Sequence, residues 1–74
     1  MAEVTMVPVS SRSGWVRAAG YDFERHELYV QFRDARVRYR GTPVSFFNGL
    51  ARAGSAGRYI HTSGLYNRPY TRVG

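Results

Sequence analysis

The chain contains no cysteine, so a disulfide framework and any site built from thiolates are both excluded. No apolar run comes near the roughly 20 residues that a membrane-spanning helix needs. The first residues do not fit a secretory signal either, because Glu3 stands where positive charge is expected and Thr5 and Pro8 interrupt the apolar positions. With 74 residues the chain has room for one small domain with a thin core. We therefore expect a small cytoplasmic domain, monomeric and without a membrane segment.

Lysine is absent as well, and acidic residues are few and confined to one part of the chain. All 11 basic residues are arginines, whose planar guanidinium groups suit phosphate and carboxylate and stack on aromatic rings. Residues 1–34 carry four arginines and all five acids, for a net charge of 4 − 5 = −1, whereas residues 35–74 carry seven arginines and no acid, for +7. This asymmetry favours a polyanion or an acidic protein surface as partner, although a solvated basic face has the same composition.

The residues that catalysis needs are scarce. The chain has two histidines: His26 lies beside Glu24 and Glu27, and His61 lies in a region without an acid to orient it. A catalytic triad would need a partner from the distant half of the chain, and two histidines without cysteine do not make a structural zinc site. The stretch "AGSAGRY" has glycines but lacks the strand-to-helix context of a phosphate-binding loop, so it indicates a turn. We expect a protein that is not an enzyme and uses no metal or cofactor.

Alternation of apolar and polar residues predicts an antiparallel sheet in the first half of the chain. A short strand is expected from Trp15 to near Gly20, and the clearest strand is residues 27–33, where every second side chain is apolar. Asp34 and Ala35 then give the separation of a two-residue hairpin. Because alanine is a poor residue for the positive φ of such a turn, a longer or bulged turn is also compatible with the sequence.

The next strand, residues 36–40, has a distinctive pattern. Its alternation places Val37 and Tyr39 on one face, which should meet the core. The opposite face then carries three arginines, Arg36, Arg38 and Arg40. Their expected neighbours across the hairpin are Tyr29, Gln31 and Arg33.

Residues 42–54, "TPVSFFNGLARAG", predict a helix with Thr42 as N-cap, Pro43 as first helical residue and Gly54 as stop signal. Gly49 inside it costs about 1 kcal/mol relative to alanine, and its missing side chain would permit close approach to the sheet. An apolar stripe for packing on the sheet is formed by Phe46, Phe47, Leu50 and Ala53. The expected fold class is α+β, an antiparallel sheet of three to four strands packed on one α-helix.

The expected division of the chain is an extended N-terminal arm, an α+β domain and a basic C-terminal tail, at residues 1–12, 13–65 and 66–74. Apolar residues of the arm suit addition to a partner's sheet edge, and the expected protein-binding residues are Val4, Met6 and Val7. The same residues also suit a first strand of the domain's own sheet, or a frayed end.

Tyrosine and arginine alternate toward the C-terminus, a pattern suited to base stacking and phosphate contact. Tyr59 better suits the core, whereas Tyr70 beside Pro69 should be exposed. The expected nucleic-acid-binding residues, taken from the sheet face and this region, are Arg33, Arg36, Arg38, Arg40, Arg58, Arg68, Tyr70 and Arg72.

Several short motifs follow one another over about residues 13–59. They are Ser13-Gly14, Gly20-Tyr21-Asp22, Leu28, Val30, Phe32, the "VRYRGTP" stretch, Leu50, Ala53, Ser55, Gly57 and Arg58-Tyr59. Their order and spacing resemble the KTSC domain family, named from the C-terminal extension of some lysyl-tRNA synthetases and also found as a stand-alone bacterial and phage protein. The resemblance implies a small α+β unit with a suggested role in RNA binding.

The chain departs from that family pattern at two positions. The family shows a Tyr-x-Tyr ahead of a Val-Pro, and this chain has Val37 and Thr42 where the first tyrosine and the valine are expected. Tyr39 and Pro43 are retained. Valine at this site indicates that the pair belongs to the core rather than to a stacking platform.

Two functional hypotheses follow. In one, the protein is a regulator that docks on a nucleic-acid machine such as bacterial RNA polymerase and influences transcription; small phage proteins that bind host RNA polymerase are similar to this chain in size and basic character. In the other, the arginine face and the tail bind nucleic acid directly, RNA more readily than DNA.

Overall fold

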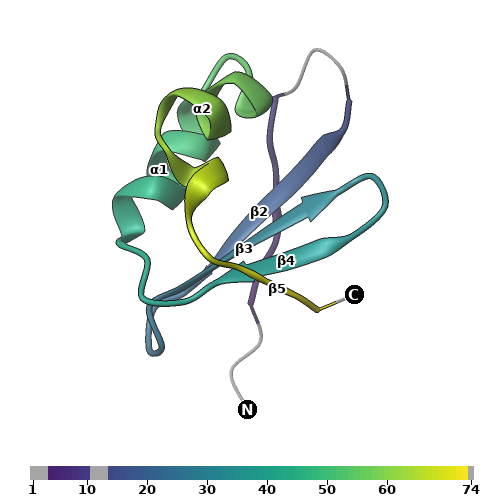
Figure 1. Cartoon of the computed structure of the whole chain (residues 1–74). Coiled ribbons are helices and arrows are strands. Elements are labelled where there is room, and N and C mark those ends of the chain that lie inside the picture. Colours follow the sequence, from purple (N-terminus) through teal and green to yellow (C-terminus); the bar gives the residue numbers. More distant parts are fainter. Residues whose placement is uncertain (1–3, 11–13, 74) are drawn as a thin grey trace.

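The chain folds into an antiparallel sheet with helices packed on one of its faces, as the computed structural model in Figure 1 shows. The structure describes residues 4–10 and 14–73, so parts of the expected arm, residues 1–3 and 11–12, lie outside the described residues. In chain order the elements are β1 (Val7–Pro8), β2 (Val16–Asp22), β3 (Glu27–Phe32), β4 (Arg36–Tyr39), α1 (Val44–Arg52), α2 (Ala56–Thr62), the 3-10 helix η1 (Leu65–Asn67) and β5 (Thr71–Arg72).

The α+β class is confirmed, but the sheet has five strands where three to four were expected. The strands are ordered β1-β2-β3-β4-β5, and every neighbouring pair is antiparallel. The added strands are the short edges: β1 lies within the expected arm, and β5 lies within the expected tail. A first strand of the domain's own sheet was one of the alternatives left open for the arm, and the pairing of β1 with β2 agrees with it. The two residues of β5 are too few to show an alternating pattern, so periodicity did not reveal that strand.

The β3–β4 hairpin has the predicted faces. Val30 pairs with Val37, and Leu28 pairs with Tyr39, and all four side chains are buried. The turn is longer than the two-residue alternative, since residues 33–35 separate the strands and the Phe32 N–H donates to the Ala35 carbonyl at 2.7 Å. The longer connection removes the need for two consecutive positive φ values, to which alanine is poorly suited.

The first helix has the expected stripe but begins one residue later than predicted. Pro43 takes the N-cap position, with φ −60° and ψ 147°, and no side chain caps the helix. Thr42 does not act as N-cap because it is buried and its hydroxyl donates to the Arg40 carbonyl at 3.2 Å. At the other end α1 stops at Arg52, two residues before Gly54.

A second helix, α2, occupies the region for which the sequence indicated a turn, and it corrects the expectation of a single helix. Ser55 caps it by accepting a hydrogen bond from the Arg58 N–H at 3.4 Å. Gly57 made a helix hard to recognise in the sequence, because glycine lowers helix propensity. A side chain at this position would collide with Trp15, since a Cβ would lie 2.9 Å from the indole nitrogen. The glycine that lowers helix propensity thus permits α2 to approach the sheet side of the core.

The core lies between the sheet and the helices. Its largest fully buried apolar side chains come from β2, β3, α1, α2 and η1: Val16, Leu28, Val30, Leu50, Ile60 and Leu65. Tyr59 packs against this core, as predicted. Gly49 gives room to the Tyr59 ring on α2 and not to the sheet, which corrects that expectation. Within residues 4–10 and 14–73, no helix is long and apolar enough to cross a membrane.

Candidate nucleic-acid interface

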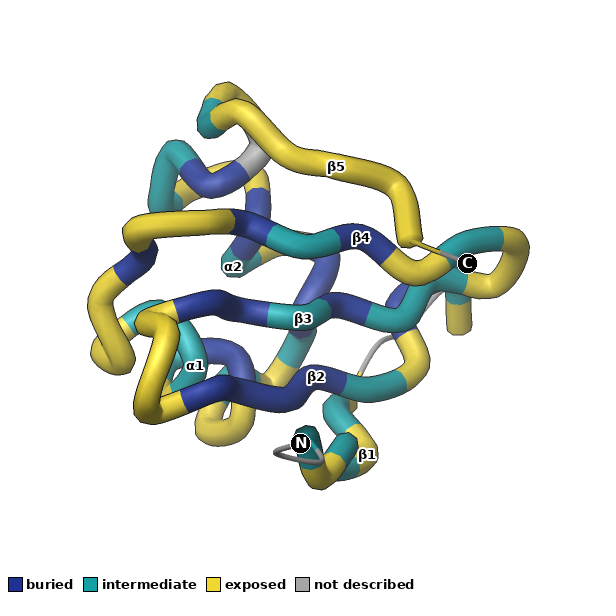
Figure 2. Tube along the Cα trace, turned by 90° about the horizontal axis from the view of Figure 1, so that it is seen from below, coloured by how far each residue is buried: buried dark blue, intermediate teal, exposed yellow. Residues whose placement is uncertain are grey.

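The arginines of β4 lie on the sheet face turned away from the helices. Because Val37 and Tyr39 are buried toward the helices, Arg36 and Arg38, which alternate with them, project from the opposite face. Arg40 continues the alternation beyond the strand. We call this surface the outer face; Figure 2 views the sheet with both helices behind it. The alternation of apolar and polar residues predicted the face of these three side chains correctly, because alternation along a strand depends only on the local sequence.

Two of the three arginines are held by polar neighbours on β3. The Arg36 Nε donates to the Gln31 side-chain oxygen at 2.9 Å. The Arg40 Nε lies 3.3 Å from a carboxylate oxygen of Glu27. Glu27 also accepts a hydrogen bond from the Tyr29 hydroxyl at 3.2 Å. The Arg40 side chain is 73% exposed and that of Glu27 only 6%, so the carboxylate anchors one end of a guanidinium that remains largely open to solvent.

Arg38 lies at the centre of this face, in register with Tyr29 on β3 and Thr71 on β5. Its Nε is buried and has no hydrogen-bond partner among the described residues. Within that part of the chain, neither Arg36 nor Arg38 forms an ion pair with a carboxylate. Two guanidinium groups without carboxylate partners on one face can therefore receive phosphate without first breaking an ion pair.

The N-terminal segment, residues 4–6, crosses the outer face beside the arginines. It passes so close to Gly20 that a Cβ there would lie 2.7 Å from Met6 Sδ and from Val4 Cγ1. A hollow of about 470 Å³ remains between this segment, Tyr29 and Arg36. Val4 and Met6 are therefore half-buried on the protein's own sheet, and Val7 pairs with Ala19 in the β1–β2 ladder. The three expected protein-binding residues contact the chain's own fold.

The remaining expected nucleic-acid-binding residues are dispersed. Arg33 lies in the hairpin turn, and Arg58 is exposed on α2. Arg72 pairs with Val37 and so lies on the helix side of the sheet, where it donates to the Asp34 carbonyl at 3.3 Å. Arg58 and Arg72 therefore do not share the outer face with the β4 arginines.

Two further residues of the expected tail contact the domain. Arg68 donates to the Gly41 carbonyl at 3.1 Å and lies over the Phe46 ring, 5.4 Å from its centre. Tyr70 is 59% exposed and lies against Tyr39, with 5.8 Å between ring centres. The expected tail, residues 66–74, therefore contacts the domain through Arg68 and Tyr70.

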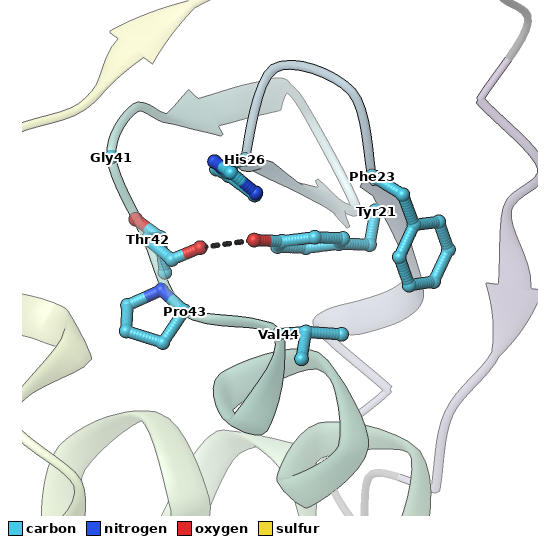
Figure 3. Close-up of a pocket in the computed structure, with 7 residues that line it drawn as sticks. All are labelled: Tyr21, Phe23, His26, Gly41, Thr42, Pro43 and Val44. Carbon is cyan, nitrogen blue, oxygen red and sulfur yellow. Dashed lines mark hydrogen bonds between the residues drawn. The ribbon is translucent and has the colours of Figure 1, made fainter.

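A pocket that the sequence did not predict lies at one end of the sheet (Figure 3). Its volume is about 480 Å³, and it is lined by Tyr21, Phe23, His26, Gly41, Thr42, Pro43 and Val44. These residues come from the end of β2, the β2–β3 turn, the β4–α1 connection and the first residue of α1. Antiparallel pairing of the three central strands brings the two connections together at the same end.

Hydrogen bonds join the walls of this pocket. The Tyr21 hydroxyl donates to the Thr42 carbonyl, and the Thr42 N–H donates to the His26 carbonyl at 3.0 Å. Burial raises the pKa of Tyr21 above its ordinary value, and the negative charge of Asp22 raises it further, so the hydroxyl keeps its proton and remains a donor. Gly41, at φ 58°, allows the chain to leave β4 and turn toward α1.

The β2–β3 turn holds its shape through Asp22. One oxygen of this carboxylate accepts hydrogen bonds from the Glu24 N–H at 3.0 Å and the Arg25 N–H at 3.1 Å. His26 closes the turn with φ 56°, a left-handed conformation that is uncommon for a residue with a side chain. The turn thus places His26 at the rim of the pocket.

Comparison with known proteins agrees with the family resemblance. The KTSC domain family model matches residues 12–63. Among solved structures, the chain is similar to a KTSC domain protein from Yersinia pestis, known from a crystal structure, with a TM-score of 0.83 and 26% sequence identity over 97% of this chain and 100% of that one. No curated protein matches the sequence. The suspected relationship to phage regulators of RNA polymerase finds no support in these matches.

Proposed function

This chain belongs to the KTSC domain family, and we propose that it is a non-enzymatic module that binds single-stranded nucleic acid, RNA in preference to DNA, on the outer face of its sheet. The observation that carries the proposal is the row of Arg36, Arg38 and Arg40 on one face; of these three arginines, Arg40 alone forms an ion pair with another described residue. The preference for RNA rests on the role suggested for the family.

The outer face offers the two kinds of contact that a single strand needs. Guanidinium groups neutralise phosphates, and release of the displaced counterions drives binding. Tyr29 lies directly opposite Arg38 across the β3–β4 ladder, so an aromatic ring stands beside the phosphate-binding groups. Stacking of a base on such a ring is sequence-tolerant, because every base has a π-face.

Docking of the N-terminal segment on a protein such as RNA polymerase has less support. Such docking would require Val4, Met6 and Val7 to leave contacts that they make with β2, at Gly20 and Ala19. A partner would have to compensate for the loss of those contacts before gaining affinity.

The proposal is tested by measuring the binding of a fluorescently labelled 12-nucleotide RNA of mixed sequence at several salt concentrations. Each neutralised phosphate contributes roughly −0.7 to the slope of log K against log salt on a single strand. The double variant Arg36→Gln/Arg38→Gln should therefore flatten the slope by up to about 1.4 and weaken binding. DNA of the same sequence should bind more weakly than RNA.

A matched control separates a site from general attraction to a basic protein. The variant Arg52→Gln/Arg58→Gln removes the same charge from exposed positions on α1 and α2. It should keep most of the wild-type slope. Equal flattening by both double variants would refute a site on the outer face, and absence of RNA binding by the wild-type protein would refute the function.

A further inference from the structure

The pocket at the end of β4 is open, aromatic and adjacent to the arginine row. Arg40, the last arginine of the row, directly precedes Gly41, and Arg25 directly precedes His26; both glycine and histidine line the pocket. A single-stranded nucleic acid whose phosphates contact the β4 arginines would therefore reach the pocket directly after Arg40. Its volume of about 480 Å³ is within the range of small-molecule sites.

The lining suits a flat, partly apolar group. Phe23 is 67% exposed, and its ring lies edge-on to that of Tyr21, with 5.1 Å between ring centres. Figure 3 shows the His26 ring on one side of the Tyr21 ring and the side chains of Pro43 and Val44 on the other. The exposed ring of Phe23 at the rim provides a surface on which a planar group can stack.

The pocket also offers polar atoms to the edge of such a group. Among the described residues, the His26 ring makes no hydrogen bond, and the Tyr21 hydroxyl, which donates to Thr42, still has oxygen lone pairs to accept one. The backbone around His26 is held at φ 56° by the hydrogen bond from Thr42. A residue held in a sparsely populated conformation by its surroundings is a feature that recurs at ligand sites.

We propose that this pocket binds one unstacked base of a single-stranded RNA, with Phe23 as the stacking ring and His26 at the base edge. The inference rests on the proposed function, because the phosphates flanking that base would lie on Arg40 and the β4 row. Proteins commonly recognise unpaired RNA by stacking its splayed-out bases on aromatic side chains.

The test uses the same labelled RNA and three single variants. Phe23→Ala should weaken binding roughly 5- to 150-fold, the range for the loss of one base-aromatic stack, and should leave the salt slope unchanged, because no phosphate contact is removed. Phe23→Tyr, which keeps an aromatic ring, should bind with near wild-type affinity. Tyr70→Ala, which removes another exposed ring on the helix side of the sheet, should have a smaller effect.

A second readout follows the base itself. An RNA that contains 2-aminopurine should lose fluorescence on binding to the wild-type protein and to Phe23→Tyr, and should lose less on binding to Phe23→Ala. Thermal melts should show that each variant is folded, because the replaced side chains are mostly exposed.

The outcomes distinguish this inference from the function on which it rests. Unchanged affinity of Phe23→Ala, together with a slope flattened by Arg36→Gln/Arg38→Gln, would overturn the base pocket and leave the outer face as the site. Equal weakening by Phe23→Ala and Tyr70→Ala would also overturn it. If the wild-type protein does not bind the RNA at all, both the function and the pocket are refuted.

Discussion

Replacing Gly49 with alanine should destabilise the protein even though alanine is the better helix former. Gly49 lies inside α1, where alanine would add about 1 kcal/mol of helix stability. However, a Cβ at this position would lie 2.6 Å from Cε1 of Tyr59 and would overlap the end of the ring even more closely. Forcing an extra carbon into such a contact costs about 1–3 kcal/mol, because Tyr59 must leave its place against the core.

The steric cost should outweigh the gain in propensity, with a net loss of about 1 kcal/mol, or a fall in Tm of about 4–8 °C for a domain of this size. The free energy of unfolding is measured by urea denaturation, with circular dichroism as the signal. A double-mutant cycle isolates the cause: leucine at position 59 keeps apolar bulk but lacks the ring atoms that collide.

In the Tyr59→Leu background, Gly49→Ala should therefore stabilise the protein by up to about 1 kcal/mol. The sign of the substitution should reverse between the two backgrounds, a coupling of about 2 kcal/mol, within the range for residues in contact. If Gly49→Ala destabilises both backgrounds equally, the contact with Tyr59 is not what requires glycine, and the reasoning is refuted.

The remaining predictions concern the two faces of β4 and the pocket hydroxyl. Val37→Asp should unfold the domain, since it buries an unpaired carboxylate in a small core, whereas Arg38→Ala should stay folded; equal circular dichroism melts would contradict the assigned faces. Tyr21→Phe should cost about 1–2 kcal/mol, because the buried carbonyl of Thr42 loses its donor. Since the pKa of Tyr21 is raised in the folded protein, its contribution is present below about pH 10 and lost as the pH rises further; the stability difference between wild type and Tyr21→Phe should shrink above that pH, and a difference that grows would contradict the raised pKa.

The β3–β4 hairpin was predictable because each strand shows a complete alternating pattern. Leu28 and Val30 on one strand, and Val37 and Tyr39 on the next, reveal the buried face without reference to any distant part of the chain. The same local pattern assigned Arg36, Arg38 and Arg40 to the outer face. The first helix was equally visible because its apolar stripe extends over two turns.

The second helix and the strand β5 were not predictable in the same way, and β1 was only one of three alternatives that the sequence left open for the arm. The glycine in α2 argues against a helix until the position of Trp15 is known, and β1 and β5 exist only because β2 and β4 offer partners. Ser55 followed by a run without proline was the available signal for α2.

The candidate pocket depends on contacts between residues far apart in the sequence. Tyr21 and Thr42 meet because β2, β3 and β4 pair in order, and no periodicity relates the two positions. The family resemblance covers both positions: Tyr21 lies in the Gly-Tyr-Asp motif, and Thr42 lies in the "VRYRGTP" stretch, at a position where the family shows valine. One segment directly precedes the β3–β4 hairpin and the other directly follows it, so the two could have been expected to lie at the same end of the sheet.

The order of the strands in the sheet equals their order in the chain, and this bears on how the protein folds. Three of the four strand pairings join consecutive elements, so little chain entropy is lost when each forms. The fourth pairing, β4 with β5, must wait until both helices bridge the interval between Val37 and Arg72. We therefore expect the meander β2-β3-β4 to form early and quickly, and the edge beside the arginine row to be the last part of the sheet to close.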